Sequence, residues 1–372
     1  MIPFLENLDW RGFLARPELP PPRPEALNAL RREPILITGA GGSIGSALAL
    51  RLGALRAPLV LLETSESNLY ALERDWAAAL ATNACSTNLM TSILGIVADV
   101  TLLQEIFATH APRIVFHAAA FKHVPLMEEQ LLAAIANNIF ATETLVKVAT
   151  VHGARVILLS TDKAVEPASV MGATKRVAEQ IVLAAGGTVL RLGNVLGSRD
   201  SVAEIFARQI AQGGPVTVND PAARRYFLTL DEAANLLLGA TVLAEPSALL
   251  APVLPATHFI ADLAHFMARE LAPERNIAVE FTEPRPGDKE AELLWKASDH
   301  SCPAGVDGMV LVKVAGPAEA ELNGQLASLR AALDTRDQCA ALAELRAMVP
   351  DYTPSQTVLA AARRQNDRCT HG

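Results

Sequence analysis

A predicted strand, a glycine-rich turn and a predicted helix follow one another near the start of the chain, and they constrain its fold more than any other segment. Residues 34–38 (Pro-Ile-Leu-Ile-Thr) form the strand, and the helical residues 46–52 follow a turn that carries Gly39, Gly42 and Gly45. Gly39 permits the tight turn, Gly42 lets a backbone approach a pyrophosphate, and Gly45 lets the helix lie close to the strand. Without the flanking strand and helix, these glycines would indicate only a tight turn. The segment predicts a dinucleotide site in an α/β fold.

Two further features refine this site. The amides of Ser43 and Ile44 open the helix, where backbone N–H groups face phosphates. A second apolar run, residues 59–62, ends in Glu63, and an acid about 20 residues past the glycines bonds the adenosine ribose and repels a 2′-phosphate. Thr64 follows, with no adjacent Arg to hold such a phosphate. The acid favours NAD and leaves NADP as the alternative; a solvated acid at a strand end is the competing interpretation.

Two more strands continue the predicted sheet. Residues 92–98 are apolar and end at Asp99 and Val100, where an adenine amine would be held. Residues 113–117 form the fourth strand. It leads into three small residues that let a backbone pass close to a ligand: Ala118, Ala119 and Ala120. All five of these residues are predicted to contact the cofactor.

Polar residues follow the fourth strand. His117 has apolar neighbours and is predicted to be structural rather than catalytic, because such histidines are usually buried. Lys122 and His123 come next, and Lys122 is a candidate for both the cofactor and the substrate site. Asn138 lies in an apolar helix, where it is expected either to brace the helix or to hydrogen-bond backbone near the cofactor.

The fifth predicted strand, residues 155–160, is followed by Thr161, Asp162 and Lys163. In an open α/β sheet, ligands bind in the crevice beyond the carboxyl ends of the strands. The chain therefore places a hydroxyl, a carboxylate and an ammonium in succession where chemistry is expected.

The helix that follows carries Met171 and Lys175, which lie four residues apart and therefore on one face. A hydroxyl at a strand end and a Lys on the next helix are how short-chain dehydrogenases hold a nicotinamide and a substrate alcohol. Their usual fourth member is a Tyr four residues before the Lys. Here that position is Met171, the most consequential departure in the sequence.

The second half of the chain predicts a smaller α/β lobe. Another strand, residues 187–192, leads into Asn194, and a helix over 202–212 and a strand over 215–218 follow. Arg225 and Arg285 lie in two later cationic segments, and arginines that flank a cleft can clamp a diphosphate. Surface solvation is the competing interpretation.

Composition excludes several classes of protein. Of 372 residues, 51% are hydrophobic and 19% are charged, so a sizeable core is expected and global disorder is not. A net charge of -8 argues against nucleic acid as a partner. The four cysteines show no paired spacing, so neither a disulfide framework nor a metal site is expected: Cys85, Cys302, Cys339 and Cys369. No signal peptide and no apolar run of about 18 residues are seen, which predicts a cytoplasmic protein without a membrane span.

The two ends of the chain are predicted to be accessory. An amphipathic turn or two precedes a Pro-rich linker, and its expected role is packing or subunit contact. Residues 1–16 are the candidate contact in a homo-oligomer. The apolar positions of this turn are Phe4, Leu5, Leu8, Trp10, Phe13 and Leu14. Residues 318–348 have an amphipathic helical pattern, and a loose tail is expected from Gln365.

Several segments together resemble the CapD-like polysaccharide-biosynthesis family, nucleotide-sugar 4,6-dehydratases of the extended short-chain dehydrogenase superfamily. The resemblance runs from about residue 10 to about residue 354. It is carried by residues 38–46, 117–127, 160–165, 169–176, 193–198, 213–218, 225–227 and 285–289. Many members carry N-terminal membrane helices, and we expect this chain to resemble the form without them.

The resemblance implies a UDP-sugar substrate, most often UDP-N-acetylglucosamine, converted to a 4-keto-6-deoxy sugar with NAD as cofactor. By the same resemblance, Thr161 bonds the C4 oxygen, Asp162 and Lys163 serve as acid and base for the elimination, and Lys175 holds the nicotinamide ribose. Substrate contacts are implied for Lys122, Asn194, Arg225 and Arg285.

Met171 leaves the first step open, because a thioether cannot usefully accept the C4 hydroxyl proton. Asp162, or Lys175 through water, is the expected replacement base. The alternatives are a UDP-sugar 4-epimerase, which has no use for the Asp162–Lys163 pair, and a non-catalytic protein that binds NAD and a nucleotide sugar.

These interpretations give a doubly wound parallel Rossmann-type sheet with a smaller C-terminal substrate-binding lobe. The predicted divisions are an arm and linker (1–33), the dinucleotide-binding domain (34–192, continued by 227–250), the lobe (193–226 and 251–300) and a C-terminal helical extension with a tail (301–372).

Overall fold

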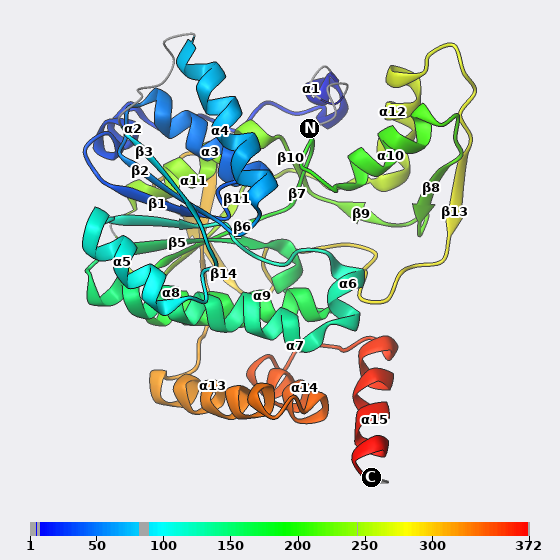
Figure 1. The fold of residues 1–372 in the computed structure, drawn as a ribbon. Helices are drawn as coiled ribbons and strands as arrows, with labels where there is room; N and C mark the ends of the chain where they lie inside the picture. Colours follow the sequence, from blue (N-terminus) through cyan, green and yellow to red (C-terminus); the bar gives the residue numbers. More distant parts are fainter. Residues whose placement is uncertain (1–4, 6–7, 82–88, 244, 371–372) are drawn as a thin grey trace.

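The computed structural model describes residues 5, 8–81, 89–243 and 245–370, with the side chains of residues 365–370 excluded. Phe4 and Cys85, named above, lie outside the described residues. A nine-stranded sheet forms the centre (Figure 1). Its strands are β1 (Ile35–Thr38), β2 (Leu59–Glu63), β3 (Met90–Leu94), β4 (Ile114–His117), β5 (Arg155–Thr161), β6 (Thr188–Leu192), β11 (Ala248–Pro252), β14 (His300–Pro303) and β15 (Met309–Lys313).

The strand order is β14-β15-β11-β6-β5-β4-β1-β2-β3. Every neighbouring pair from β3 to β11 is parallel, whereas β15 is antiparallel to both β11 and β14. The strand order reverses beside β1, where β2 pairs on one edge and β4 on the other, and ligands bind at such a switch point.

Helices cover both faces of the sheet (Figure 1). One face carries α2 (Pro24–Leu30), α3 (Ser43–Ala54), α4 (Glu66–Ala81) and α11 (Leu230–Gly239); the other carries α5 (Val100–His110), α8 (Ala141–Val151) and α9 (Val170–Ala184). Successive residues of β1 enter different cores, because strand side chains alternate: Leu36 joins the α8–α9 side, while Ile35 and Ile37 join the α3 side. The prediction of a doubly wound parallel sheet is confirmed.

A smaller lobe has its own apolar core. It contains α10 (Val202–Ala211), α12 (Ile260–Leu271) and three two-stranded sheets. These pair β8 (Val216–Asn219) with β13 (Val279–Thr282), β9 (Arg224–Arg225) with β12 (His258–Phe259), and β7 (Asn194–Val195) with β10 (Phe227–Leu228).

The N-terminal arm packs on its own chain, one of its two predicted roles, while its role as a subunit contact stays a prediction. Its helix α1 (Trp10–Leu14) joins the core of the lobe, and the Phe13 ring lies 5.1 Å from that of Phe266. Arg16 then forms a buried ion pair with Glu232 on α11, with N–O distances of 2.6 and 2.9 Å. The arm therefore ties the lobe to the helices of the main sheet.

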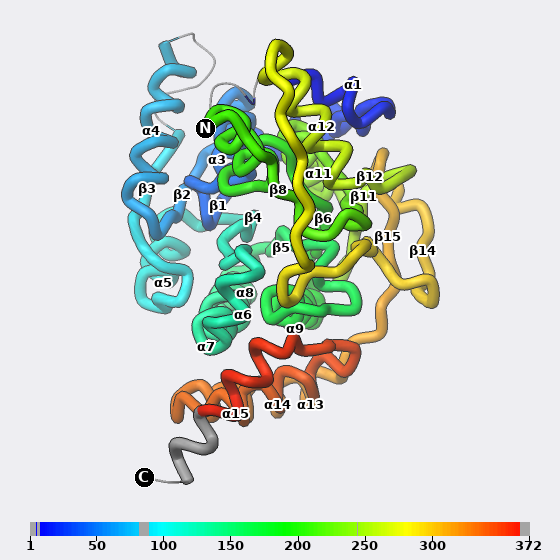
Figure 2. Tube along the Cα trace, turned by 90° about the vertical axis from the view of Figure 1, so that its right-hand side faces the viewer, coloured from blue at the N-terminus to red at the C-terminus, as the bar shows by residue number. Residues whose placement is uncertain are grey.

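The C-terminal prediction is wrong in two places. Residues 301–313 are not part of a helical extension, because β14 and β15 extend the central sheet. The predicted loose tail is instead the end of helix α15 (Gln356–Thr370). Between them, α13 (Glu319–Asp334) and α14 (Gln338–Met348) pack outside α9, as a third layer that Figure 2 shows below the main body.

One segment corrects the expectation that no apolar run is long enough to cross a membrane. The helical stretch Leu131–Val151 passes by length and composition, and 72% of its apolar window is buried inside the protein. A core helix of a globular protein passes the same test, so this stretch is weak evidence for a membrane span.

Candidate active site

The glycine turn has the close contacts that the sequence predicts. Gly39 has a φ of +66°, and a Cβ there would lie 2.7 Å from the backbone N of Ala119. A Cβ on Gly45 would overlap the carbonyl oxygen of Gly39, so the helix α3 can lie this close only with glycine. A Cβ on Gly42 would meet only that same oxygen, at 3.2 Å, so the other side of Gly42 stays open to a ligand.

Glu63 is buried and supports the turn. Its Oε2 accepts a hydrogen bond from the N–H of Gly41 at 2.9 Å, and its Oε1 accepts from the N–H groups of Thr64 and Ser65. The carboxylate thereby fixes the turn to the end of β2. Its predicted contact with a ribose stays a prediction.

The other predicted cofactor residues lie either beside the glycine turn and the start of α3 or at the start of α5. Ala118 and Ala120 follow β4 and, like Ala119, are half-buried beside the turn, while Ser43 and Ile44 open α3. Asp99 and Val100 do not end a strand, because β3 ends at Leu94. Asp99 is instead the N-cap of α5, where its Oδ1 accepts from the N–H of Leu102 at 3.0 Å.

Asn138 hydrogen-bonds both a backbone and a neighbouring helix, and its predicted contact with the cofactor stays a prediction. It lies in a π-helical turn (Ile135–Phe140) and is buried. Its Oδ1 accepts from the N–H of Phe121 at 2.8 Å, and its Nδ2 donates to the carbonyl of Phe121 and to Oγ1 of Thr174. The amide thus joins the loop after β4 to α9.

His117 is structural, as predicted. Its ring nitrogens lie 2.7 Å from Oγ1 of Thr38 and 2.9 Å from Oγ1 of Thr142. Burial, together with the charge of Lys175, lowers the pKa of His117 to about 3, so the ring is neutral.

Thr161, Asp162 and Lys163 form the centre of the candidate site. β5 ends at Thr161, and a 3-10 turn (Asp162–Ala164) begins directly after it. Oδ1 of Asp162 accepts from Thr161 Oγ1 at 2.9 Å and from Lys163 Nζ at 3.0 Å. Lys163 Nζ also donates to Oδ1 of Asn194 at 2.9 Å. The other carboxylate oxygen, Oδ2, is buried and has no hydrogen-bond partner among the described residues.

Helix α9 places Lys175 behind this turn. The Nζ of Lys175 donates to the carbonyl of Leu159 at 2.7 Å, and burial lowers the pKa of Lys175 to about 8. Met171 is buried on the same helix, with 4% of its surface exposed. A Cβ on Gly172 would overlap the carbonyl oxygen of Lys163, so the start of α9 is in direct contact with the 3-10 turn.

A buried ionic cluster that the sequence analysis missed contacts β5 through Ser160. Glu179 on α9 accepts hydrogen bonds from Arg191 at 2.7 and 2.8 Å and from Ser160 at 2.6 Å. Burial alone would raise the pKa of Glu179, but Arg191, Arg176 and Ser160 outweigh it and hold that pKa at about 2. Neither member had a local signal, because Glu179 and Arg191 meet only through tertiary packing.

Two of the predicted substrate cations, Arg225 and Arg285, lie in the lobe, where Arg285 donates to Asn219. Burial raises the pKa of Asp288, while the charges of Arg225, Arg285 and Lys163 oppose that rise, so all three cations lie near one carboxyl group. Arg225 is buried and donates to the carbonyl oxygens of Arg224 and Glu290. Lys122 instead donates to the carbonyl of Arg199, at 2.7 Å.

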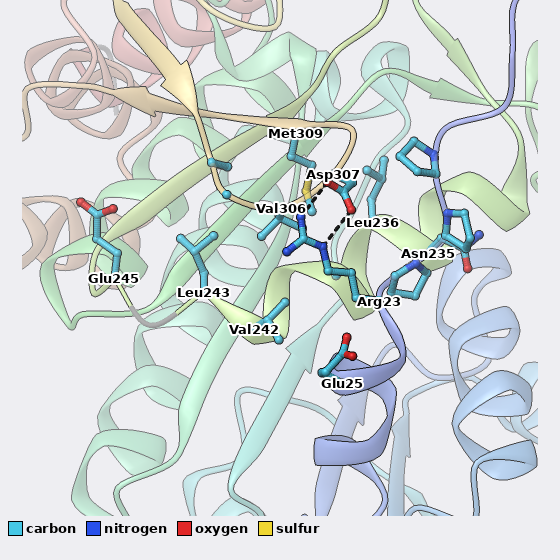
Figure 3. A pocket seen from close by; sticks show the side chains of 16 residues that line it. Arg23, Glu25, Asn235, Leu236, Val242, Leu243, Glu245, Val306, Asp307 and Met309 are labelled. Atoms are coloured by element: carbon cyan, nitrogen blue, oxygen red, sulfur yellow. Dashed lines mark hydrogen bonds and ion pairs between the residues drawn. The ribbon is translucent and has the colours of Figure 1, made fainter.

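A cavity of about 490 Å³ lies away from this centre, between the Pro-rich linker, α11 and the loop that joins β14 to β15 (Figure 3). Arg23 and Asp307 form an ion pair at its edge, with N–O distances of 2.9 Å. None of the predicted site residues lines it. The candidate chemistry therefore belongs to the end of β5 and not to this cavity.

Comparisons with known proteins show what the chain is similar to. The profile of the family described as "Polysaccharide biosynthesis protein" matches residues 35–313. The chain is 37% identical over 287 residues to the probable polysaccharide biosynthesis protein EpsC of Bacillus subtilis, covering 74% of this chain and 47% of that protein. It is 37% identical over 285 residues to the capsular polysaccharide biosynthesis protein CapD of Staphylococcus aureus, covering 73% and 46%. The chain spans about half the length of these curated relatives.

Other similar proteins carry two different activities in their names. A UDP-glucose 4-epimerase of Rickettsia canadensis is 31% identical over 275 residues, which are 71% of this chain and 78% of that protein. Among solved structures, Pen from Bacillus thuringiensis has a TM-score of 0.69 at 26% identity, covering 76% of this chain and 90% of its own. The dTDP-glucose 4,6-dehydratase DesIV of Streptomyces venezuelae, with NAD bound, has a TM-score of 0.59 at 17% identity. The match covers 69% of this chain and 87% of DesIV, and it shows a similar fold alone. The chain belongs to the polysaccharide biosynthesis protein family.

Proposed function

We propose that the protein is a nucleotide-sugar 4,6-dehydratase. Its substrate would be a UDP-hexose, with UDP-N-acetylglucosamine as the first candidate, and its product the 4-keto-6-deoxy sugar for surface polysaccharide or glycan biosynthesis. The observation that carries this proposal is the contact of Lys163 Nζ with Asp162 Oδ1 at 3.0 Å, beside Thr161. An elimination of water needs an acid for the leaving hydroxyl and a base for the neighbouring carbon, and this contact joins two groups of those types.

NAD is the cofactor of the proposed reaction, with NADP as the alternative. The glycine turn, Ser43, Ile44 and Glu63 would hold its adenosine and pyrophosphate end, and Lys175 its nicotinamide ribose. When bound, it supplies reversible hydride acceptance at the sugar C4. The residues of this chain then have to move protons at C4, C5 and the C6 oxygen.

Lys175 is the proposed base for the C4 hydroxyl, because Met171 cannot accept a proton. A pKa of about 8 leaves about one Lys175 side chain in ten neutral at pH 7, by the ordinary titration relation. Thr161 would orient the C4 oxygen. Asp162 in its protonated form would donate to the leaving C6 hydroxyl, and Lys163 in its neutral form would remove the C5 proton.

Substrate binding is proposed for the cations of the lobe. Arg225 and Arg285 would contact the diphosphate, together with Lys122, while Asn194 would orient the sugar through its contact with Lys163. The predicted cytoplasmic location, the division into domains up to residue 300 and a homo-oligomeric assembly remain proposals of the same kind.

The test is to incubate purified protein with UDP-N-acetylglucosamine and NAD⁺ in deuterated water and to record proton NMR spectra. A new C6 methyl signal with deuterium at C5 is expected, and the C5 coupling reports retention or inversion. Unchanged sugar beside tightly held cofactor would favour a non-catalytic binding protein for this substrate, and other UDP-sugars would then be tried.

The second candidate is a UDP-sugar 4-epimerase, because a relative 31% identical to this chain is named UDP-glucose 4-epimerase. The same NMR experiment separates the two. An epimerase gives a C4-epimer with no methyl signal and no deuterium at C5, since no proton leaves C5 in an oxidation and reduction confined to C4.

A further inference from the structure

The turn after β7 reaches from the lobe to the glycine turn of the main sheet through Arg199. The N–H of Arg199 donates to Oγ of Ser43 at 2.8 Å, and its Nη1 donates to the carbonyl of Gly41 at 2.8 Å and to Oδ1 of Asn68 at 2.9 Å. Its own carbonyl accepts from Lys122 at 2.7 Å. One residue thus contacts the glycine turn, α4 and the loop after β4.

The guanidinium of Arg199 forms no ion pair with the part of the chain that the structure describes. It is half-buried, and both of its hydrogen-bond acceptors are neutral. Among the described residues, no carboxylate lies within 4 Å of it, whereas Arg16, Arg191 and Arg330 all have such partners. A partly buried cation without a partner is unfavourable unless an anion joins it.

Two other positive groups lie near Arg199. Ser43 is the first residue of α3, a helix of 12 residues whose N-terminus carries a partial positive charge. Lys122 is the next cation: burial lowers its pKa, Asp200 and Glu204 oppose that lowering, and Arg199 adds to it. Two cations and a helix N-terminus therefore meet at the place where a dinucleotide would put its pyrophosphate.

We propose that Arg199 holds the cofactor in place by adding a positive charge from the lobe to the pyrophosphate site at the start of α3. This inference rests on the proposed function, because it takes the cofactor to be a dinucleotide. This role gives a reason for the contact between Arg199, a residue of the lobe, and the glycine turn. In a reaction that takes up and returns the same hydride, the cofactor has no need to leave between turnovers.

The experiment measures NAD⁺ affinity and dissociation rate in the full chain, without sugar. Arg199→Gln keeps hydrogen-bond donors but removes the charge, and Arg199→Lys keeps the charge but loses the planar fork. Arg269→Ala, at an exposed arginine of α12 in the same lobe, is the matched control. Thermal unfolding of each variant without cofactor shows whether it is folded.

Arg199→Gln is expected to weaken NAD⁺ binding by about tenfold to hundredfold, the usual range for a hydrogen bond to a charged group, with Arg199→Lys in between and the control unchanged. The affinity of the wild type should also fall more steeply with salt than that of Arg199→Gln, which a purely structural contact would not produce. Equal affinities and equal salt dependence would overturn the role of Arg199. No NAD⁺ binding by the wild type would instead overturn the proposed cofactor.

Discussion

Lys163 and Asp162 are neighbours in the chain and also in space, since Nζ of the lysine lies 3.0 Å from Oδ1 of the aspartate. As an ion pair they hold the wrong charges for an elimination, which needs a protonated acid and a neutral base. Moving one proton from Nζ to Oδ1 gives both forms at once and exchanges no proton with solvent. Asp162 is fully buried, so its carboxyl group is out of contact with solvent during this transfer.

Substitution of either Asp162 or Lys163 should therefore impair the same step. Asp162→Asn and Lys163→Met are each expected to lower kcat for the proposed dehydration by about 10²–10⁴, the usual worth of a general acid or base. The double variant should be little worse than either single variant, because residues that act as a unit are not additive. Fully additive losses, measured by product formation, would show that the two act independently.

The pKa of Lys175 predicts how the rate of the first step, oxidation at C4, depends on pH. Since the pKa of Lys175 is about 8, its neutral form grows as pH rises through that value, and the rate of C4 oxidation should rise with it and then level off. Cofactor absorbance at 340 nm after rapid mixing with substrate measures this step. Lys175→Arg keeps the charge but cannot be deprotonated, so it should lose the rising limb at every pH. A rising limb in that variant would assign the base elsewhere.

Met171 should be replaceable by another apolar side chain. Met171→Leu conserves volume in a buried position, so a loss of less than about 1.5 kcal/mol in the free energy of unfolding is expected, with kcat within a few-fold of the wild type. Urea unfolding and the product assay measure the two quantities. A loss of kcat as large as that of Lys175→Arg would show that the sulfur has a chemical role.

The buried cluster of Glu179 and Arg191 should make stability depend on acid. Burial opposes ionisation of Glu179, but Arg191 outweighs it, so the pKa in the folded protein is about 2 against an ordinary 4.5. The carboxylate binds fewer protons in the folded state than in the unfolded one. Its stabilisation is therefore complete above about pH 4.5 and is lost as pH falls toward about 2.

Glu179→Gln leaves Arg191 buried without its charge partner and should cost about 3–5 kcal/mol at pH 7. The difference from the wild type should shrink as pH is lowered toward 3, as followed by urea unfolding at each pH. Arg208→Ala, which removes an exposed partner of Glu204, is the control and should change stability little. A difference that stays constant with pH would mean that packing, not charge, stabilises the cluster.

The parts of the site that the sequence predicts are those whose neighbours are close in the chain. The strand, glycine turn and helix at residues 34–52 are one local unit, and so is the run from Thr161 to Lys175. Apolar runs likewise placed most strands to within a few residues. For β3 the prediction was shifted, because its residues are only partly buried and the apolar stretch 95–98 continued the pattern past its end at Leu94.

The parts that the sequence did not predict depend on tertiary contacts. Arg199 follows a recognised segment by one residue, but nothing local shows that its side chain reaches Gly41. The apolar residues of the arm predict that it packs or forms a contact, but not where, and they complete a core contributed by α10 and α12. The strand β15 is a short apolar run that the predicted helical extension included, and its antiparallel pairing with β11 is a tertiary contact that no local pattern shows.

The third layer formed by α13 and α14 has a consequence for exchange with solvent. A helix on an open α/β sheet usually keeps one face in water, but α9 lies between the sheet and this layer, and Val177, Ile181 and Val182 are all buried. The amides of α9 should then exchange with deuterium only when the outer helices detach or the whole domain opens. The helix that holds Lys175 would thus be among the slowest segments of the protein to exchange, and its protection would report on the attachment of helices that never touch the substrate.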